Sequence, residues 1–232
     1  MTSSLTSPGA GLSYSLAFIG GFGDAAGFVL AKTFTGHITG NLVLAAVSIA
    51  SLDWATTLIR LSAVLSFLAG ILLSVAIARL AATHQWPPLV AAFVVEVALI
   101  SAGSLMLSHV AMGTGIFALC MSLALGLQNG AFRRSGGVSV HTTYLTGMLT
   151  GLMVSETEKL LGPQTSAPAA HDVGTRLLYG IWFCFFVGAV IGAALVLRFR
   201  EAGMLAVVLL LCVLIVRTLR EPALVLGKSP ES

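Results

Sequence analysis

The chain has 232 residues, of which 57% are hydrophobic and 9% are charged, and its formal net charge is +3. A soluble domain carries about a quarter charged residues, so this composition excludes a protein whose whole surface faces water. It also argues against nucleic-acid binding, which needs a clustered basic face. The densest basic groups here are only Arg133-Arg134 and the pair Arg217 and Arg220.

Eight apolar stretches follow one another along the chain, and we expect each of them to form a helix. They cover residues 14–31, 38–52, 61–82, 88–108, 111–131, 142–155, 177–197 and 203–217. About 20 helical residues cross a hydrocarbon core about 30 Å thick. Tails are expected at 1–13 and 221–232, and a loop rich in proline and alanine at 162–172. The sequence therefore predicts one all-α integral membrane domain over 14–217.

The first apolar stretch contains an ionisable residue, Asp24, among several glycines. A charged group at membrane depth is costly and normally faces the bundle interior or a cavity. Gly23 and Gly27 lie one helical turn apart, which predicts the close approach of a second helix. Asp24 is therefore either part of a binding site or a packing residue bonded to a neighbouring backbone, and the sequence leaves both interpretations open.

The second stretch, 38–52, has about 15 residues and is short for a full crossing. It opens with a polar run that contains His37, Thr39, Gly40 and Asn41. We expect Thr39 to cap this helix, whose first amides carry a partial positive charge suited to an anion. Irregular backbone at membrane depth is tolerated only inside protein or beside a cavity, which predicts a half-helix or re-entrant segment. Capping without any ligand is the alternative.

Both motifs return in the second half of the chain in the same order. The segment GFGD at 21–24 corresponds to GLQN at 126–129, so that an asparagine takes the place of the aspartate. The second short stretch, 142–155, matches the first, and its Thr-Gly at 146–147 corresponds to the Thr-Gly at 39–40. We therefore predict two copies, over 14–108 and 111–217. Chance matching of apolar sequence rich in glycine and alanine is the alternative.

The distribution of Lys and Arg favours a topology in which the two short stretches do not cross. If all eight stretches cross, the 12 basic residues divide six against six between the two sides. If the short stretches return to the side from which they entered, the division becomes eight against four. This predicts six crossings, two inverted copies, and both termini in the cytoplasm of a bacterial inner membrane. Inverted repeats with broken helices are a recurring plan of secondary transporters.

The polar residues of the repeated motifs form the candidate site for a polar or anionic small solute. They are Asp24, His37, Thr39, Gly40, Asn41, Gln128, Asn129, Thr143, Thr146 and Gly147. A scaffold or assembly partner that transports nothing is the alternative, and the sequence leaves open a homodimer. His37 and His141 could couple solute to protons or only pack as hydrogen-bond donors. Glu96 is a further intramembrane acid, and its role is open.

Enzymatic and metal chemistry are not expected. The segment from Gly137 to His141 lacks the second glycine of a nucleophile elbow. The histidines and the three cysteines show no spacing typical of a zinc site. We therefore expect no catalytic residues, no cofactor and no metal, and a lipid bilayer as the main partner.

The paired motifs also carry a family resemblance. They are GFGDA at 21–25 with HITGN at 37–41, and GLQN at 126–129 with TTYLTG at 142–147. In these motifs the chain resembles the YoaK family, small bacterial membrane proteins defined by a domain of unknown function. The resemblance covers 14–217 and implies a single-domain inner-membrane protein with about six spans, but no substrate. Met148 stands where the first copy has Asn41, so the two halves need not contribute equally.

Overall fold

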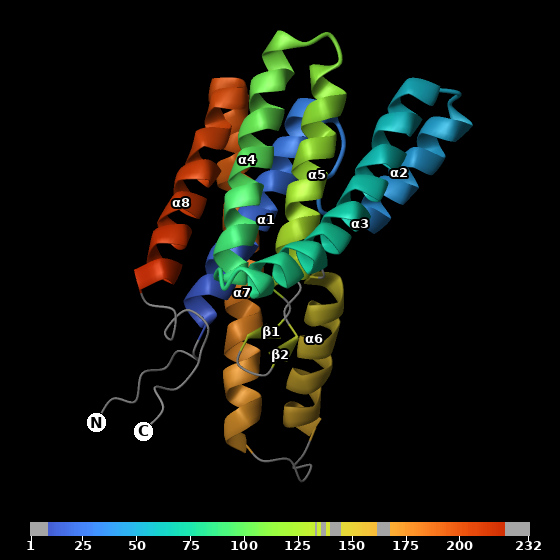
Figure 1. Ribbon diagram of the computed structural model, residues 1–232. Helices are drawn as coiled ribbons and strands as arrows, with labels where there is room; N and C mark the ends of the chain where they lie inside the picture. Colours follow the sequence, from blue (N-terminus) through green and yellow to red (C-terminus); the bar gives the residue numbers. More distant parts are fainter. Residues whose placement is uncertain (1–8, 133, 136–137, 140–144, 162–167, 221–232) are drawn as a thin grey trace.

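The computed structural model describes residues 9–132, 134–135, 138–139, 145–161 and 168–220. The described chain is built of α-helices, with one 3-10 helix and a pair of two-residue antiparallel strands (Figure 1). The helices are α1 (Ala10–Ala31), α2 (Ile38–Ala50), α3 (Trp54–Thr83), α4 (Pro88–His109), α5 (Gly113–Ala131), α6 (Leu145–Leu161), α7 (Pro168–Phe199), η1 (Arg200–Met204) and α8 (Leu205–Arg220), and the strands are β1 (Arg134–Ser135) and β2 (Val138–Ser139). Each predicted helix is present, which confirms the all-α membrane fold.

Several helix boundaries differ from the prediction, among them the end of α6, which lies at Leu161 rather than at 155. α3 begins at Trp54 rather than at 61, because the side chain of Asp53 accepts a hydrogen bond of 3.1 Å from the Thr56 amide and starts the helix earlier. Hydrogen bonds from Thr56 also lower the pKa of the Asp53 carboxyl. α7 begins at Pro168, inside the predicted loop, since proline fits the first helical position where its missing N–H is not needed. α1 begins at Ala10, inside the predicted tail.

The outside of the helices is apolar, as a lipid environment requires. Along α3, Leu58, Leu65 and Leu72 follow one another at intervals of seven residues and are 65%, 66% and 72% exposed. Five stretches in the described chain are long and apolar enough to cross a membrane, and the last of them, Thr175–Arg220, covers most of α7 and all of α8. The chain reverses at η1 between these two helices (Figure 1).

Two close helix crossings form the centre of the bundle. α1 packs most extensively against α7, and α5 packs against α3 and α4. A Cβ added to Gly21 of α1 would lie 2.0 Å from the carbonyl oxygen of Phe185 in α7. A Cβ added to Gly126 of α5 would lie 2.1 Å from the carbonyl oxygen of Phe67 in α3. Only glycine permits backbones to approach this closely.

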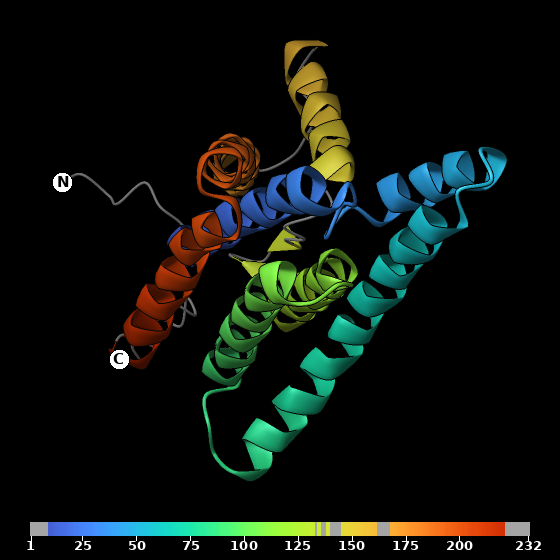
Figure 2. The same cartoon turned by 90° about the horizontal axis from the view of Figure 1, so that it is seen from above.

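The short helix α2 lies at the edge of the bundle. In the view from above it runs beside the first half of α3, away from the centre where α1 passes (Figure 2). The described part of α2 packs mainly on α3, and that of α6 mainly on α7. Each short helix therefore packs mainly against the long helix that follows it in the chain.

Candidate functional site: a return segment along α1

After α1 the chain turns back and runs alongside the helix it has just left (Figure 1). Lys32 ends α1 in the left-handed conformation, with φ at 53°, and its amide donates to the Phe28 carbonyl. Residues 33–35 then lie against Gly27, where an added Cβ would come within 2.5 Å of the Thr35 Cγ2. We call residues 32–37 the return segment. Gly27 was expected to face a second helix, and it makes room for this segment instead.

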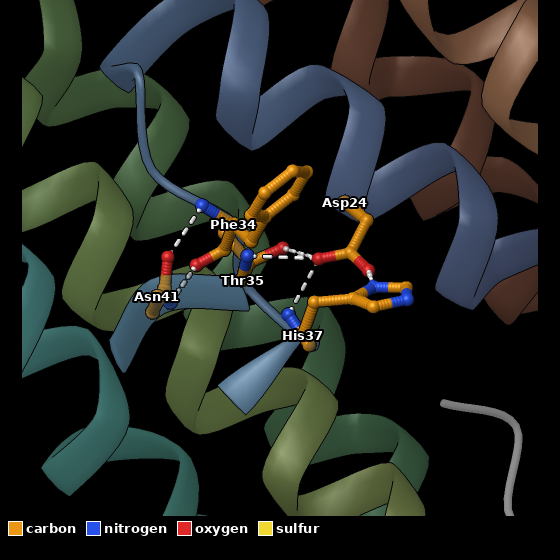
Figure 3. A network of polar contacts seen from close by, with 6 residues as sticks. Asp24, Phe34, Thr35, His37 and Asn41 are labelled. Atoms are coloured by element: carbon orange, nitrogen blue, oxygen red, sulfur yellow. Dashed lines mark hydrogen bonds and ion pairs between the residues drawn. The ribbon is translucent and has the colours of Figure 1, made fainter. Parts of the chain in front are cut away.

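The carboxylate of Asp24 holds the tip of the return segment (Figure 3). Its Oδ1 accepts hydrogen bonds from the backbone amides of Thr35, at 2.9 Å, and Gly36, at 2.6 Å. Its Oδ2 is bonded to Nδ1 of His37. Asp24 is 4% exposed and lies seven residues before the end of α1, about 10 Å inside that end. The segment therefore returns by about two helical turns before α2 begins.

The hydrogen bond to Asp24 fixes the orientation of the His37 ring. Because an ionised carboxylate only accepts hydrogen bonds, Nδ1 of His37 acts as the donor and the second ring nitrogen, Nε2, points away from Asp24 (Figure 3). The ring also makes an edge contact with Phe185 of α7, with 5.8 Å between the ring centroids. The side chain is 36% exposed, so the ring is not sealed inside the bundle.

Asn41 fixes the same segment from the other side. Its Oδ1 accepts from the amide of Phe34 at 3.0 Å, and its Nδ2 donates to the Phe34 carbonyl at 2.6 Å (Figure 3). The side chain thus pairs with both polar groups of one residue, as a neighbouring strand would. Asn41 is fully buried, so it positions the segment and does not face a solute.

The first turn of α2 is open. His37 occupies the N-cap position without a side-chain capping bond, so the prediction that Thr39 caps the helix is wrong. Thr39 is the second residue of α2 and is exposed. Asn41 is the first residue of α2 whose backbone amide has an acceptor: it donates a hydrogen bond of 3.0 Å to the His37 carbonyl. Within the described chain no bond is found for the amides of Ile38, Thr39 and Gly40, and these groups carry the positive end of the helix dipole.

Arg60 fastens α2 to α3, a role that the sequence interpretation missed. Its guanidinium donates to the Leu44 carbonyl at 2.6 Å and to the hydroxyl of Ser48, both on α2. In the sequence Arg60 counted only as a topological charge. An arginine two turns inside an apolar helix is nevertheless a signal for an internal hydrogen-bond partner.

Gln128 of the second half does not meet Asp24 at one point. Gln128 donates to the carbonyl of Leu16, eight residues and about 12 Å before Asp24 along α1. α5 touches α1 near Asp24 through Leu125 and Met121, whose side chains lie against Gly23. Asn129 follows Gln128 and is half-buried.

The remaining predicted residues lie on or before α6. Thr146 and Gly147 are in its first turn, and Gly147 is half-buried. The side chain of Thr146 lies outside the described residues, as do Thr143 and His141. Two cavities are described, one of about 360 Å³ between α4, η1 and α8 and one of about 430 Å³ between α3, α4 and α5. Thr39 lines neither of them.

We expect Asn41→Ala to lower the free energy of unfolding by about 2 kcal/mol, because it leaves both polar groups of Phe34 without partners in a largely buried place. Thermal unfolding of the purified protein in detergent measures the effect. Thr39→Ala is the control, since this exposed residue makes no bond in the described chain and its loss should change stability by less than about 0.5 kcal/mol. Equal melting temperatures for the two variants would contradict the assigned role of Asn41.

Comparison with known proteins agrees with a membrane protein and leaves the activity open. The family described as "Protein of unknown function (DUF1275)" matches residues 12–217. UPF0700 transmembrane protein YoaK of Bacillus subtilis (strain 168) is 27% identical over 181 residues, which are 77% of this chain and 80% of that protein. No solved structure matches.

Proposed function

We propose that this chain, which belongs to the DUF1275 family of proteins of unknown function, is a transporter or channel-like protein for a polar or anionic small solute. Membership confirms the resemblance to the YoaK family expected from the sequence. The similar Bacillus subtilis protein is named a transmembrane protein, in agreement with the apolar helices of this chain. The proposed activity is binding and passage of the solute without a chemical change.

The observation that carries the proposal is the open first turn of α2 beside His37. The amides of Ile38, Thr39 and Gly40, for which the described residues offer no acceptor, supply donors and partial positive charge, and Nε2 of His37 adds a further polar group. The carboxylate of Asp24 is fully engaged by the return segment, so its negative charge is compensated locally. Broken helices whose N-termini point at anionic groups are the usual substrate sites of secondary transporters.

The helix crossings support the proposal of an inverted repeat. Gly21 of α1 meets the Phe185 carbonyl, and Gly126 of α5 meets the Phe67 carbonyl in the same manner. The long helices also contribute a glycine to each crossing. A Cβ added to Gly188 of α7 would lie 2.1 Å from the carbonyl oxygen of Phe18 in α1. A Cβ added to Gly70 of α3 would lie 2.2 Å from the carbonyl oxygen of Leu123 in α5. In all four contacts, the carbonyl belongs to a residue that lies three positions before the glycine on the same helix. In α7, for example, Phe185 lies three positions before Gly188. The first helix of each half thus packs on the long helix of the other half.

The helix ends support the proposed topology, with both termini in the cytoplasm. In Figure 1, α1 begins and α8 ends on the same side of the bundle, where α3 also ends and below which α6 and the first half of α7 extend. Charged helix termini at this end carry Arg79, Arg217 and Arg220, and those at the opposite end carry Lys32, Arg60, Arg198 and Arg200. In the six-crossing topology expected from the sequence, Arg133, Arg134, Lys159, Arg176 and Lys228 fall on the same side as Arg79, Arg217 and Arg220. A more basic side is typically cytoplasmic.

A membrane scaffold without transport is the second candidate. It is favoured by the complete engagement of Asp24 and Asn41 within the chain, because satisfied, buried polar groups are what a purely structural network requires. Thr39 is exposed and makes no bond in the described chain, so it has no such structural use. The two candidates therefore differ in what the exposed residues do.

A thermal-shift screen of the purified protein against inorganic anions, carboxylates and polar metabolites tests the proposal. A solute present at 100 times its dissociation constant should stabilise the protein by about 2.7 kcal/mol. Thr39→Ala should keep the melting temperature of the free protein, because Thr39 is exposed and makes no bond in the described chain. It should reduce the shift, because it removes an exposed hydroxyl group beside the amides that we propose bind the solute. No shift by any solute, together with no flux in reconstituted vesicles, would leave the scaffold as the better account.

A further inference from the structure

α4 carries a carboxyl group in the interior of the bundle, apart from the return segment. Glu96 is 0% exposed, and neither of its oxygens has a hydrogen-bond partner in the described chain. It shares one face of α4 with Phe93, Ile100 and Gly103, at helical spacings. That face packs against α5, since a Cβ added to Gly103 would lie 2.8 Å from the Cβ of Cys120.

No described charged group compensates Glu96. α4 packs against α3, α5, η1 and α8. The charged residues of these elements are Arg60, Arg79, Arg200, Glu201, Arg217 and Arg220, and the remaining titratable ones are Cys120 and Cys212. Arg60 is bonded to α2 and Glu201 to Ser108, and none of the described residues forms an ion pair with Glu96. An ionised carboxylate in such surroundings would be strongly destabilising, so the group is neutral here.

The residues around Glu96 also determine whether a metal cation or a proton can bind there. A metal cation needs several oxygen ligands, but the oxygens of Glu96 have no polar neighbour within bonding distance in the described chain. No group of three or more potential metal-ligating His, Cys, Asp or Glu residues is found there either. A proton needs only one oxygen, so it is the ligand that this site accommodates.

We propose that Glu96 is a proton-binding site, separate from the return segment, that is loaded in the present conformation and exchanges its proton in another. In the exchange the carboxylate and a proton from water combine to the carboxylic acid, and no other group is oxidised or reduced. The unsatisfied oxygens destabilise the present conformation relative to one in which water reaches them. Intramembrane acids of this kind mark proton pathways. The inference does not rest on the proposed solute site.

Infrared spectroscopy of the protein reconstituted in lipid tests the inference directly. At neutral pH the wild-type protein should show the carbonyl band of a protonated carboxylic acid, and transfer to D2O should shift that band to lower frequency. Glu96→Gln should remove the band, because the amide carries no carboxyl group. Asp24→Asn is the matched control and should retain it. If Glu96→Gln does not fold, Glu96→Leu removes the carboxyl as well.

Two results would overturn the inference. The first is the absence of a protonated-carboxyl band from the wild-type protein at neutral pH. The second is a band that Glu96→Gln removes but that stays unshifted after long incubation in D2O, since this describes a neutral side chain that only packs. Neither result depends on finding a transported solute, so the failure of this inference and that of the proposed function are distinguishable.

Discussion

Gly21→Ala should prevent stable folding, with a loss of about 3 kcal/mol or more in the free energy of unfolding. The added methyl group would lie 2.0 Å from the carbonyl oxygen of Phe185 and 3.1 Å from the amide nitrogen of Ala189. Both atoms belong to the backbone of α7, so no side-chain rotation relieves the clash and the two helices must separate. Close packing is the main force between helices in lipid, so this separation weakens the most extensive contact of α1.

The same helix offers a matched control for this substitution. Gly11 also lies in α1, but a Cβ there would meet nothing within 4 Å. Gly11→Ala should therefore stabilise the protein by about 0.5–1 kcal/mol, because alanine loses less backbone entropy in a helix. Thermal unfolding and size-exclusion profiles in detergent measure both variants. Equal melting temperatures for Gly21→Ala and Gly11→Ala would show that the crossing with α7 is not as close as described.

The helices of this fold could be predicted from the sequence because lipid leaves the backbone few alternatives. A long uncharged stretch in a bilayer must satisfy its amides internally, so apolar runs and helices coincide. The boundaries could not be predicted as well. Hydropathy does not register the cap that Asp53 provides for α3, and it treats the polar start of α7 at Pro168 as a loop. Helix ends depend on single hydrogen bonds rather than on the average composition of a window.

The candidate site was predictable in its members but not in its geometry. Asp24, His37 and Asn41 stood out as polar residues in apolar surroundings, and the structure brings them to one segment. The sequence did not reveal that the chain reverses at Lys32, because a left-handed residue other than glycine has no clear signal. The reversal brings the amides of residues 35 and 36 to Asp24, and it leaves Thr39 exposed instead of capping α2.

Asp24→Ala should lower the free energy of unfolding by about 3 kcal/mol, the second large effect that we expect. The substitution leaves the buried amides of Thr35 and Gly36 without acceptors, and each such group costs about 1–3 kcal/mol. It also removes the partner of His37 Nδ1, so the ring loses its fixed orientation. Thermal unfolding in detergent measures the loss, with Thr39→Ala as the control for a substitution in the same region that breaks no bond.

Asp24→Asn separates the geometry of this contact from its charge. The amide oxygen of asparagine can still accept from Thr35 and Gly36, and its NH2 group can donate to Nδ1 of a His37 ring in the opposite tautomer. We therefore expect a loss of only about 1 kcal/mol, the value of one ordinary hydrogen bond. In that tautomer Nε2 carries the proton, so the open side of His37 changes from an acceptor to a donor. If Asp24→Asn were as unstable as Asp24→Ala, the negative charge itself would be what holds the return segment to α1.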